Sequence, residues 1–115
     1  MKHQESKLQQ ECVKWFRYQY PKRIIFAIPN GGKRGIITAS IMKAEGVLAG
    51  VPDLFIPEPT KYFSGLFIEM KSDTGKLSRN QIAMLSQLAG RGYHVVICRT
   101  VTEFMDSVNE YFNQK

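Results

Sequence analysis

The sequence predicts an α/β protein: a mixed sheet of about four strands with helices on both faces, in the order αβαββαβα. Segments whose apolar residues recur every three or four positions alternate along the chain with short apolar runs of strand length. Two such runs, residues 50–56 and 65–71, are separated only by a proline-rich polar segment, which predicts a hairpin. The 115 residues, 43% of them hydrophobic, suffice for one core, so we expect a single domain over residues 1–115.

The first predicted helix covers residues 5–20 and ends before Pro21. Its apolar side chains recur at helical spacing, at Leu8, Cys12, Trp15 and Phe16. On a helical wheel Glu5 points with these core residues, so it either complements the helix dipole or reaches a functional site. Glu11 is the alternative acid of this helix.

A first strand is expected over residues 23–28, followed by the glycine-rich loop 29–35. Glycines let a backbone approach a phosphate closely, and Lys33 and Arg34 supply positive charge, although the spacing is not that of a P-loop. We therefore expect this loop to contact a nucleic-acid backbone, with an ordinary surface loop as the alternative. A helix over residues 37–48 follows, and Gly50 is the residue expected to end it.

The predicted hairpin brings charged side chains together. If it is symmetric, its centre lies near Lys61, and Asp53 then faces Glu69 because the two residues are equidistant from it. Side chains alternate across a strand, so Glu69 and Lys71 project from one face. Facing carboxylates repel one another unless a cation lies between them, which predicts a Mg²⁺ site. Lys71 is expected beside the metal, where an ammonium orients or helps to deprotonate a water.

The ordinary interpretation of a Glu-x-Lys pattern on a strand is a solvated ion pair. Here the same strand carries apolar residues on both faces, Leu66, Phe67, Ile68 and Met70, as a central, covered strand does. Buried charges are unfavourable unless they are paired or bind a metal. The pattern therefore indicates a functional site.

A third helix is expected from Ser78, its N-cap, to about residue 89, with Ile82, Leu85 and either Leu88 or Ala89 facing inward. Gln81 lies in the first turn of this helix. The loop that precedes the helix is short, so Gln81 is expected near Lys71, where its amide can orient water or bind a phosphate oxygen. A plain surface glutamine is the alternative.

The last strand and helix follow directly. Residues 93–98 form a continuous apolar run typical of a strand, and Thr100 with Glu103 has the capping-box pattern that opens a helix. His94 has no second histidine at ligand spacing, so we expect it to be a structural residue.

Two motifs carry a family resemblance. Pro52-Asp53 followed by Glu69-Met70-Lys71 resembles the PD-(D/E)XK nuclease signature, and the downstream segment from Leu77-Ser78 to Gln81 resembles the VRR-NUC branch of it. The resemblance spans nearly the whole chain. It implies a restriction-endonuclease-like core and a stand-alone nuclease of viral or bacterial type, acting in DNA replication or repair.

The resemblance also implies roles for individual residues. Asp53, Glu69 and the Met70 carbonyl would hold Mg²⁺, which Mn²⁺ can replace. Glu5 would assist through water, since related nucleases often supply an acid from the first helix, and Lys71 would align the attacking hydroxide. Gln81 would complete the catalytic set. Ser78 is expected to contact nucleic acid together with the basic loop.

The charge balance favours a polyanionic partner. Sixteen Lys and Arg against ten Asp and Glu give a net charge of +6 and a pI near 9.5, which suits binding to nucleic acid. We expect a metal-dependent endonuclease acting on branched or duplex DNA, and a homodimer, because two cuts need two sites. The alternative is a non-catalytic nucleic-acid-binding domain. A small-molecule hydrolase lacks a Ser-His-Asp arrangement or a histidine metal cluster.

The two cysteines and the hydropathy pattern limit the remaining possibilities. Cys12 and Cys98 form no CxxC pattern, so we expect buried free thiols rather than a zinc site or a disulfide. No apolar run has the length of a signal peptide or a membrane span, so we expect a cytoplasmic protein that does not contact membrane. The family resemblance implies that the cell is bacterial or phage-infected.

Overall fold

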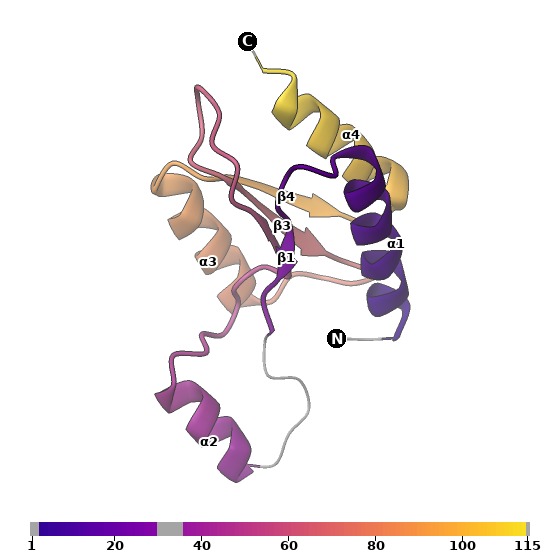
Figure 1. Cartoon of the computed structure of the whole chain (residues 1–115). Coiled ribbons are helices and arrows are strands. Elements are labelled where there is room, and N and C mark those ends of the chain that lie inside the picture. Colours follow the sequence, from indigo (N-terminus) through magenta and orange to yellow (C-terminus); the bar gives the residue numbers. More distant parts are fainter. Residues whose placement is uncertain (1–2, 30–35, 115) are drawn as a thin grey trace.

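The structure, a computed structural model, describes residues 3–29 and 36–114 (Figure 1). Four helices and four strands alternate along this part of the chain: α1 (His3–Gln19), β1 (Phe26–Ala27), α2 (Ile36–Ala44), β2 (Leu54–Ile56), β3 (Leu66–Met70), α3 (Arg79–Gly90), β4 (His94–Cys98) and α4 (Val101–Phe112). The basic loop with Lys33 and Arg34 lies outside the described residues, and so does any contact that it makes.

The strands form one mixed sheet in the order β1-β2-β3-β4. β2 pairs antiparallel with both β1 and β3, whereas β3 and β4 are parallel. α1 and α4 pack side by side against one face of the sheet, and α3 lies on the other side (Figure 1). The predicted α/β class, with a mixed four-stranded sheet between helices, is confirmed.

The core lies between the sheet and the pair of helices α1 and α4. Alternate residues of β2 and β3 point to this face, as the pleat of a strand requires, and meet the inner faces of both helices. The side chains shielded completely from solvent are Leu54, Ile56, Leu66, Ile68, Met70 and Cys98 from the strands with Cys12, Phe16, Phe104 and Val108 from the helices. Each such aliphatic or aromatic side chain stabilises the fold by about 1.5–3 kcal/mol. Cys12 and Cys98 are buried free thiols, as expected.

Three sequence-based expectations about element length and burial are wrong. β1 is shorter than residues 23–28, because the side chain of Glu58 occupies the chain before it: Glu58 pairs with Arg23 at 3.2 Å and accepts a hydrogen bond from the Ile24 N–H. α2 ends at Ala44 rather than at residue 48. Ile82 is 55% exposed rather than buried, because α3 turns only Leu85 fully towards the sheet.

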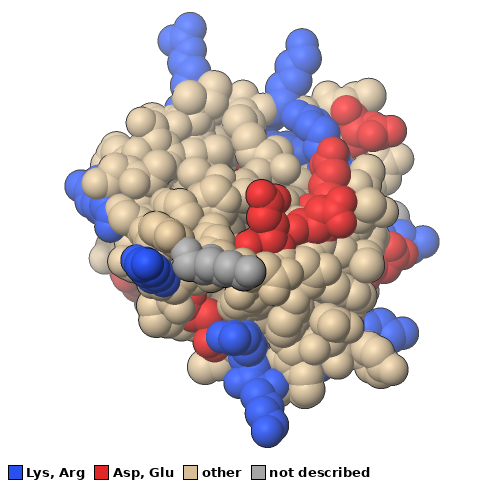
Figure 2. Space-filling view, turned by 90° about the horizontal axis from the view of Figure 1, so that it is seen from above, with Lys and Arg blue, Asp and Glu red and all other residues tan. Residues whose placement is uncertain are grey.

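The face seen from above, around the hairpin tip and the C-terminal end of α4, carries charges of both signs (Figure 2). Acidic side chains gather near its middle, and Lys and Arg side chains project at its rim. The exposed acids of α4 recur at three- and four-residue spacing, at Glu103, Asp106 and Glu110. The positive excess of the chain is therefore not concentrated on this face. None of the helices in the described ranges is long and apolar enough to cross a membrane.

Candidate active site

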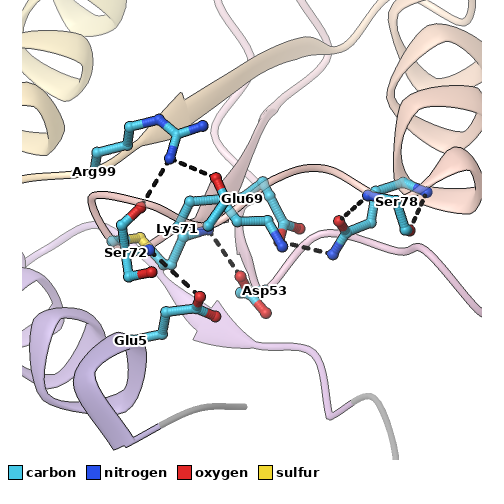
Figure 3. A network of polar contacts seen from close by, with 10 residues as sticks. Glu5, Asp53, Glu69, Lys71, Ser72, Ser78 and Arg99 are labelled. Carbon is cyan, nitrogen blue, oxygen red and sulfur yellow. Dashed lines mark hydrogen bonds and ion pairs between the residues drawn. The ribbon is translucent and has the colours of Figure 1, made fainter.

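The register of the β2–β3 hairpin places two acids opposite one another. Leu54 pairs with Ile68, Phe55 with Phe67 and Ile56 with Leu66. The same register, continued by one residue, puts Asp53 opposite Glu69, so the predicted symmetric hairpin is confirmed. The two carboxylates lie at the end of the sheet, where the chain leaves β3 (Figure 3).

Gly50 fixes the approach of the chain to Asp53. Its backbone has φ +87°, and a Cβ at this position would lie 2.5 Å from the backbone oxygen of Asn80. Only glycine tolerates both the conformation and the contact. Gly50 therefore does not end α2, as expected from the sequence, but holds the segment before β2 against the start of α3.

The side chain of Asp53 accepts the hydrogen bond that the Met70 N–H would otherwise donate to a backbone carbonyl of the neighbouring strand. Asp53 Oδ2 accepts a hydrogen bond of 2.8 Å from the Met70 N–H. The N–H and C=O groups of one residue in an extended strand point to the same side, so the Met70 carbonyl is also directed towards Asp53. Two carboxylates and one carbonyl are thus aimed at one region.

Burial changes the titration of both acids. Asp53 is 8% and Glu69 2% exposed. Burial raises the pKa of Asp53, and the hydrogen bond from Met70 partly opposes that shift. Burial and then the charge of Asp53 raise the pKa of Glu69 to about 8, although Lys71 lowers it. Without a bound cation, the pair therefore holds a proton at neutral pH.

The carboxylate of Glu69 is only partly satisfied by protein groups. Its Oε2 lies 3.6 Å from the Lys71 ammonium and accepts a hydrogen bond of 3.1 Å from the Gln81 amide. Its Oε1 is buried, and apart from the proton that the Glu69 carboxyl shares with Asp53, no donor of the described residues reaches it. Leaving a buried polar atom unpaired is unfavourable, so a ligand at this oxygen would stabilise the site.

These donors fit a hard divalent cation. Within residues 3–29 and 36–114, no three His, Cys, Asp or Glu side chains converge closely enough to hold a metal by themselves. Mg²⁺ does not require such a set, because it binds through one or two carboxylates and retains several waters. Asp53, the free oxygen of Glu69 and the Met70 carbonyl meet that need.

The structure brings Glu5, not Glu11, to the site. Glu5 lies in the first turn of α1, is 9% exposed, and accepts a hydrogen bond of 3.4 Å from the Ser72 N–H (Figure 3). Its charge also contributes to raising the pKa of Asp53. Glu11 lies on the exposed side of the same helix. A Cβ on Gly75 would lie 3.3 Å from Glu5 Oε2, so the small residue there lets the loop after Lys71 pack against Glu5.

The start of α3 positions Gln81. Ser78 is the N-cap: its hydroxyl accepts a hydrogen bond from the Gln81 N–H, while the Gln81 side-chain oxygen accepts one from the Ser78 N–H. This capping box fixes the Gln81 side chain and leaves its amide nitrogen to donate to Glu69. The hydroxyl of Ser78 is thus engaged in the cap, and its contact with nucleic acid stays a prediction.

Arg99 is part of the site and was missed by sequence reasoning. Its guanidinium donates hydrogen bonds to the backbone oxygens of Ser72 at 2.8 Å and Gly75 at 2.7 Å, which holds the loop after Lys71 (Figure 3). Met70 pairs with Cys98 in the parallel β3–β4 ladder, so Arg99 leaves the sheet beside Lys71. A basic residue just after a strand is the only signal, and it becomes informative once the strands are known to be parallel.

Comparisons with known proteins agree with this geometry. The family model described as the VRR-NUC domain matches residues 1–102. A solved structure titled "VRR_NUC domain protein" is similar with a TM-score of 0.77 at 24% identity, covering 94% of this chain and 87% of that one. Another, titled "VRR_NUC domain", has a TM-score of 0.61 at 17% identity and covers 93% and 96%. The search of curated proteins finds no match.

Proposed function

The chain belongs to the VRR-NUC domain family, a family of nucleases, and we propose that it is a metal-dependent endonuclease that hydrolyses phosphodiester bonds of DNA. The observation that carries the proposal is the pair of buried, facing acids, Asp53 and Glu69, with one carboxylate oxygen left without a partner in the described chain. Such a pair is unfavourable on its own and is stabilised by a cation.

The metal proposed is Mg²⁺, which Mn²⁺ can replace. Asp53, Glu69 and the Met70 carbonyl would hold it, and Glu5 would assist through a water. When bound, the cation supplies Lewis-acid polarisation of the phosphate and lowers the pKa of water.

Lys71 has the central role in the chemical step. Its ammonium lies 3.6 Å from Glu69 Oε2, and its side chain is 11% exposed, so it is held in one place beside the acids. There it aligns the attacking water with the phosphorus and offsets the charge that develops on the phosphate. The water oxygen forms the new bond to phosphorus and gives up one proton to solvent as the bond to the leaving oxygen breaks, and the leaving oxygen takes up one proton, so the proton count is unchanged.

Gln81 and Arg99 act as positioning residues. The Gln81 amide donates to Glu69 Oε2 and so orients that carboxylate. Arg99 holds the loop from Ser72 to Gly75, which in turn packs against Glu5 and the side chain of Lys71. The positive end of the α3 dipole lies at the same place and favours a phosphate.

The finer parts of the proposal are substrate structure and assembly. We propose branched DNA of replication or repair as the substrate, and a homodimer that presents two sites for two cuts. A panel of labelled duplex, flap, fork and four-way junction DNA with Mg²⁺ or Mn²⁺ tests the first part. Light scattering of the free and DNA-bound protein tests the second, and a monomer in both states that nicks one strand only would contradict the paired-site arrangement.

The activity itself is tested by Lys71→Ala. We expect this variant to lose cleavage while it retains metal and DNA binding, because the lysine acts in the chemical step. Lys76→Ala is the matched control, since Lys76 is an exposed lysine five positions along the chain. Cleavage by Lys71→Ala within about tenfold of the wild type, roughly 1.4 kcal/mol, would contradict the assignment. DNA binding without cleavage by the wild type would favour the non-catalytic alternative.

A further inference from the structure

A pocket of about 530 Å³ lies between α1 and β1, outside the group of catalytic residues. Its volume is in the range of sites that hold small ligands. Its α1 wall includes Ser6, Gln10, Val13 and Arg17, which fall within an arc of about 60° on a helix of 100° per residue. Most of this stripe lies on another side of α1 than the core residues Cys12 and Phe16, although Val13 also packs against the core. The pocket is therefore a separate surface of α1.

The walls of the pocket adjoin residues of the proposed active site. On α1, Ser6 follows Glu5, and Gln9 lies one turn further along. On β1, Ala27 pairs with Leu54, the neighbour of Asp53. The Ile28 N–H also donates a hydrogen bond of 2.8 Å to the Asp53 carbonyl. The α1 wall therefore begins next to Glu5, and the β1 wall pairs with the residue next to Asp53.

The wall chemistry combines positive charge with an apolar surface. Lys14 and Arg17 are exposed bases, and no acid is among the described residues that line the pocket. Val13 and Ala27 supply the apolar part, whereas the ring of Phe26, which pairs with Phe55, packs against Phe55 on the other face of the sheet. Bases beside an apolar wall suit a nucleotide, whose phosphate and flat base need different surroundings.

Gln9 supplies an independent indication of a ligand. This residue lines the pocket, and its side-chain oxygen is buried without a hydrogen-bond partner among the described residues. A buried acceptor without a donor is unfavourable. The exocyclic amino group of a nucleobase is a donor of the right kind, and Gln10 adds a second amide on the same wall.

We propose that the pocket between α1 and β1 is a subsite for one unpaired nucleotide of the DNA substrate. Its phosphate lies against Lys14 and Arg17, and its base lies against the apolar wall with its edge towards the glutamines. A base inside a duplex is stacked and paired, so it cannot present its face to such a wall. The subsite rests on the proposed nuclease function, and it selects DNA with a single-stranded arm next to the cut.

Fluorescence anisotropy in EDTA, where no DNA is cut, tests the subsite. The probes are a duplex with a single-stranded arm and a blunt duplex of the same sequence. We expect the wild type to bind the armed duplex about tenfold more tightly, and the Lys14→Ala/Arg17→Ala double variant to lose most of this preference. Lys7→Ala is the matched control: Lys7 is an exposed lysine of α1 that does not line the pocket.

Abasic residues placed one at a time along the arm test the base contact. In the wild type, one position should lower the affinity about fivefold or more, and Val13→Asp should no longer respond to that position. Tyr18→Ala, which removes an 85% exposed aromatic ring of α1, should respond like the wild type. Gln9→Ala serves as a second pocket variant, and circular dichroism checks the fold of each.

The outcomes separate the subsite from the activity. Equal affinity for armed and blunt DNA, or pocket variants that behave like Lys7→Ala and Tyr18→Ala, would overturn the subsite even if Mg²⁺ supports cleavage. Conversely, an arm preference that depends on the pocket, in a protein that cuts no DNA with Mg²⁺ or Mn²⁺, would support the subsite and contradict the nuclease proposal.

Discussion

The β2–β3 hairpin and the segment of α2 differ in how firmly the rest of the molecule holds them. Core side chains cover one face of the hairpin, the site residues occupy the end of the other, and both strands are paired on both sides. α2 stands apart from the sheet (Figure 1), and apolar side chains of this segment, Ile41 at 53% and Leu48 at 58%, are exposed. A strand with different residues on its two faces can pair with its neighbours in one register, because a shift by one residue would turn its core side chains to the other face. Helical periodicity shows that a helix has an apolar face, but it does not specify which element covers that face.

The largest difference between the hairpin and α2 is expected when one apolar side chain of each is shortened to alanine. Ile68→Ala removes a fully buried side chain of β3 and should lower the free energy of unfolding by about 2–5 kcal/mol. Ile41→Ala, the matched change on α2, should alter it by less than about 0.5 kcal/mol. Urea denaturation followed by circular dichroism measures both. Equal losses would mean that α2 packs against the core in solution.

Two glycines with positive φ sharpen the same comparison. Gly50→Ala meets the Asn80 backbone and should cost about 3 kcal/mol or more, as strain and a clash combine. Gly46→Ala has a similar φ of +105° but open space around its Cβ, so it should cost only about 1–2 kcal/mol. The difference between the two melting curves isolates the contact with Asn80. If Gly46→Ala were the more harmful, the segment before Asp53 would not be tightly held.

The protonation of Glu69 is expected to make the stability depend on pH. Its carboxyl releases a proton near pH 4.5 when unfolded but near pH 8 in the metal-free folded state, so folding retains a proton between these values. The free energy of unfolding should therefore fall as pH rises through this window. Thermal melts in EDTA at pH 5.5 and pH 8 measure the fall. Glu69→Gln should reduce it, and an unchanged pH dependence in that variant would contradict the assignment.

The hairpin could be predicted because short-range rules determine it. The centre at Lys61 and the alternation of strand residues suffice to put Asp53 opposite Glu69, and helical spacing suffices to turn Glu5 inward. Neither rule depends on how the helices and strands pack. The positions of Asp53, Glu69 and Glu5 could therefore be predicted, while the roles of these residues stay predictions.

The features that were missed depend on packing. Arg99 reaches the loop after Lys71 only because β4 runs parallel to β3. Ile82 fits the apolar period of α3 but faces solvent, because this helix contacts the sheet along a narrow line. The late start of β1 follows from a side chain thirty-four residues away from Ile24, that of Glu58. Periodicity has no information about such partners.

The central claim is that Asp53 and Glu69 together bind a divalent cation. Isothermal titration calorimetry with Mg²⁺ or Mn²⁺ tests it directly. We expect one site in the wild type, and no binding in Asp53→Ala, which should remain folded because a repulsive buried acid has been removed. Glu11→Gln, which neutralises the exposed acid of α1, should bind like the wild type. Undiminished binding by folded Asp53→Ala would contradict the claim.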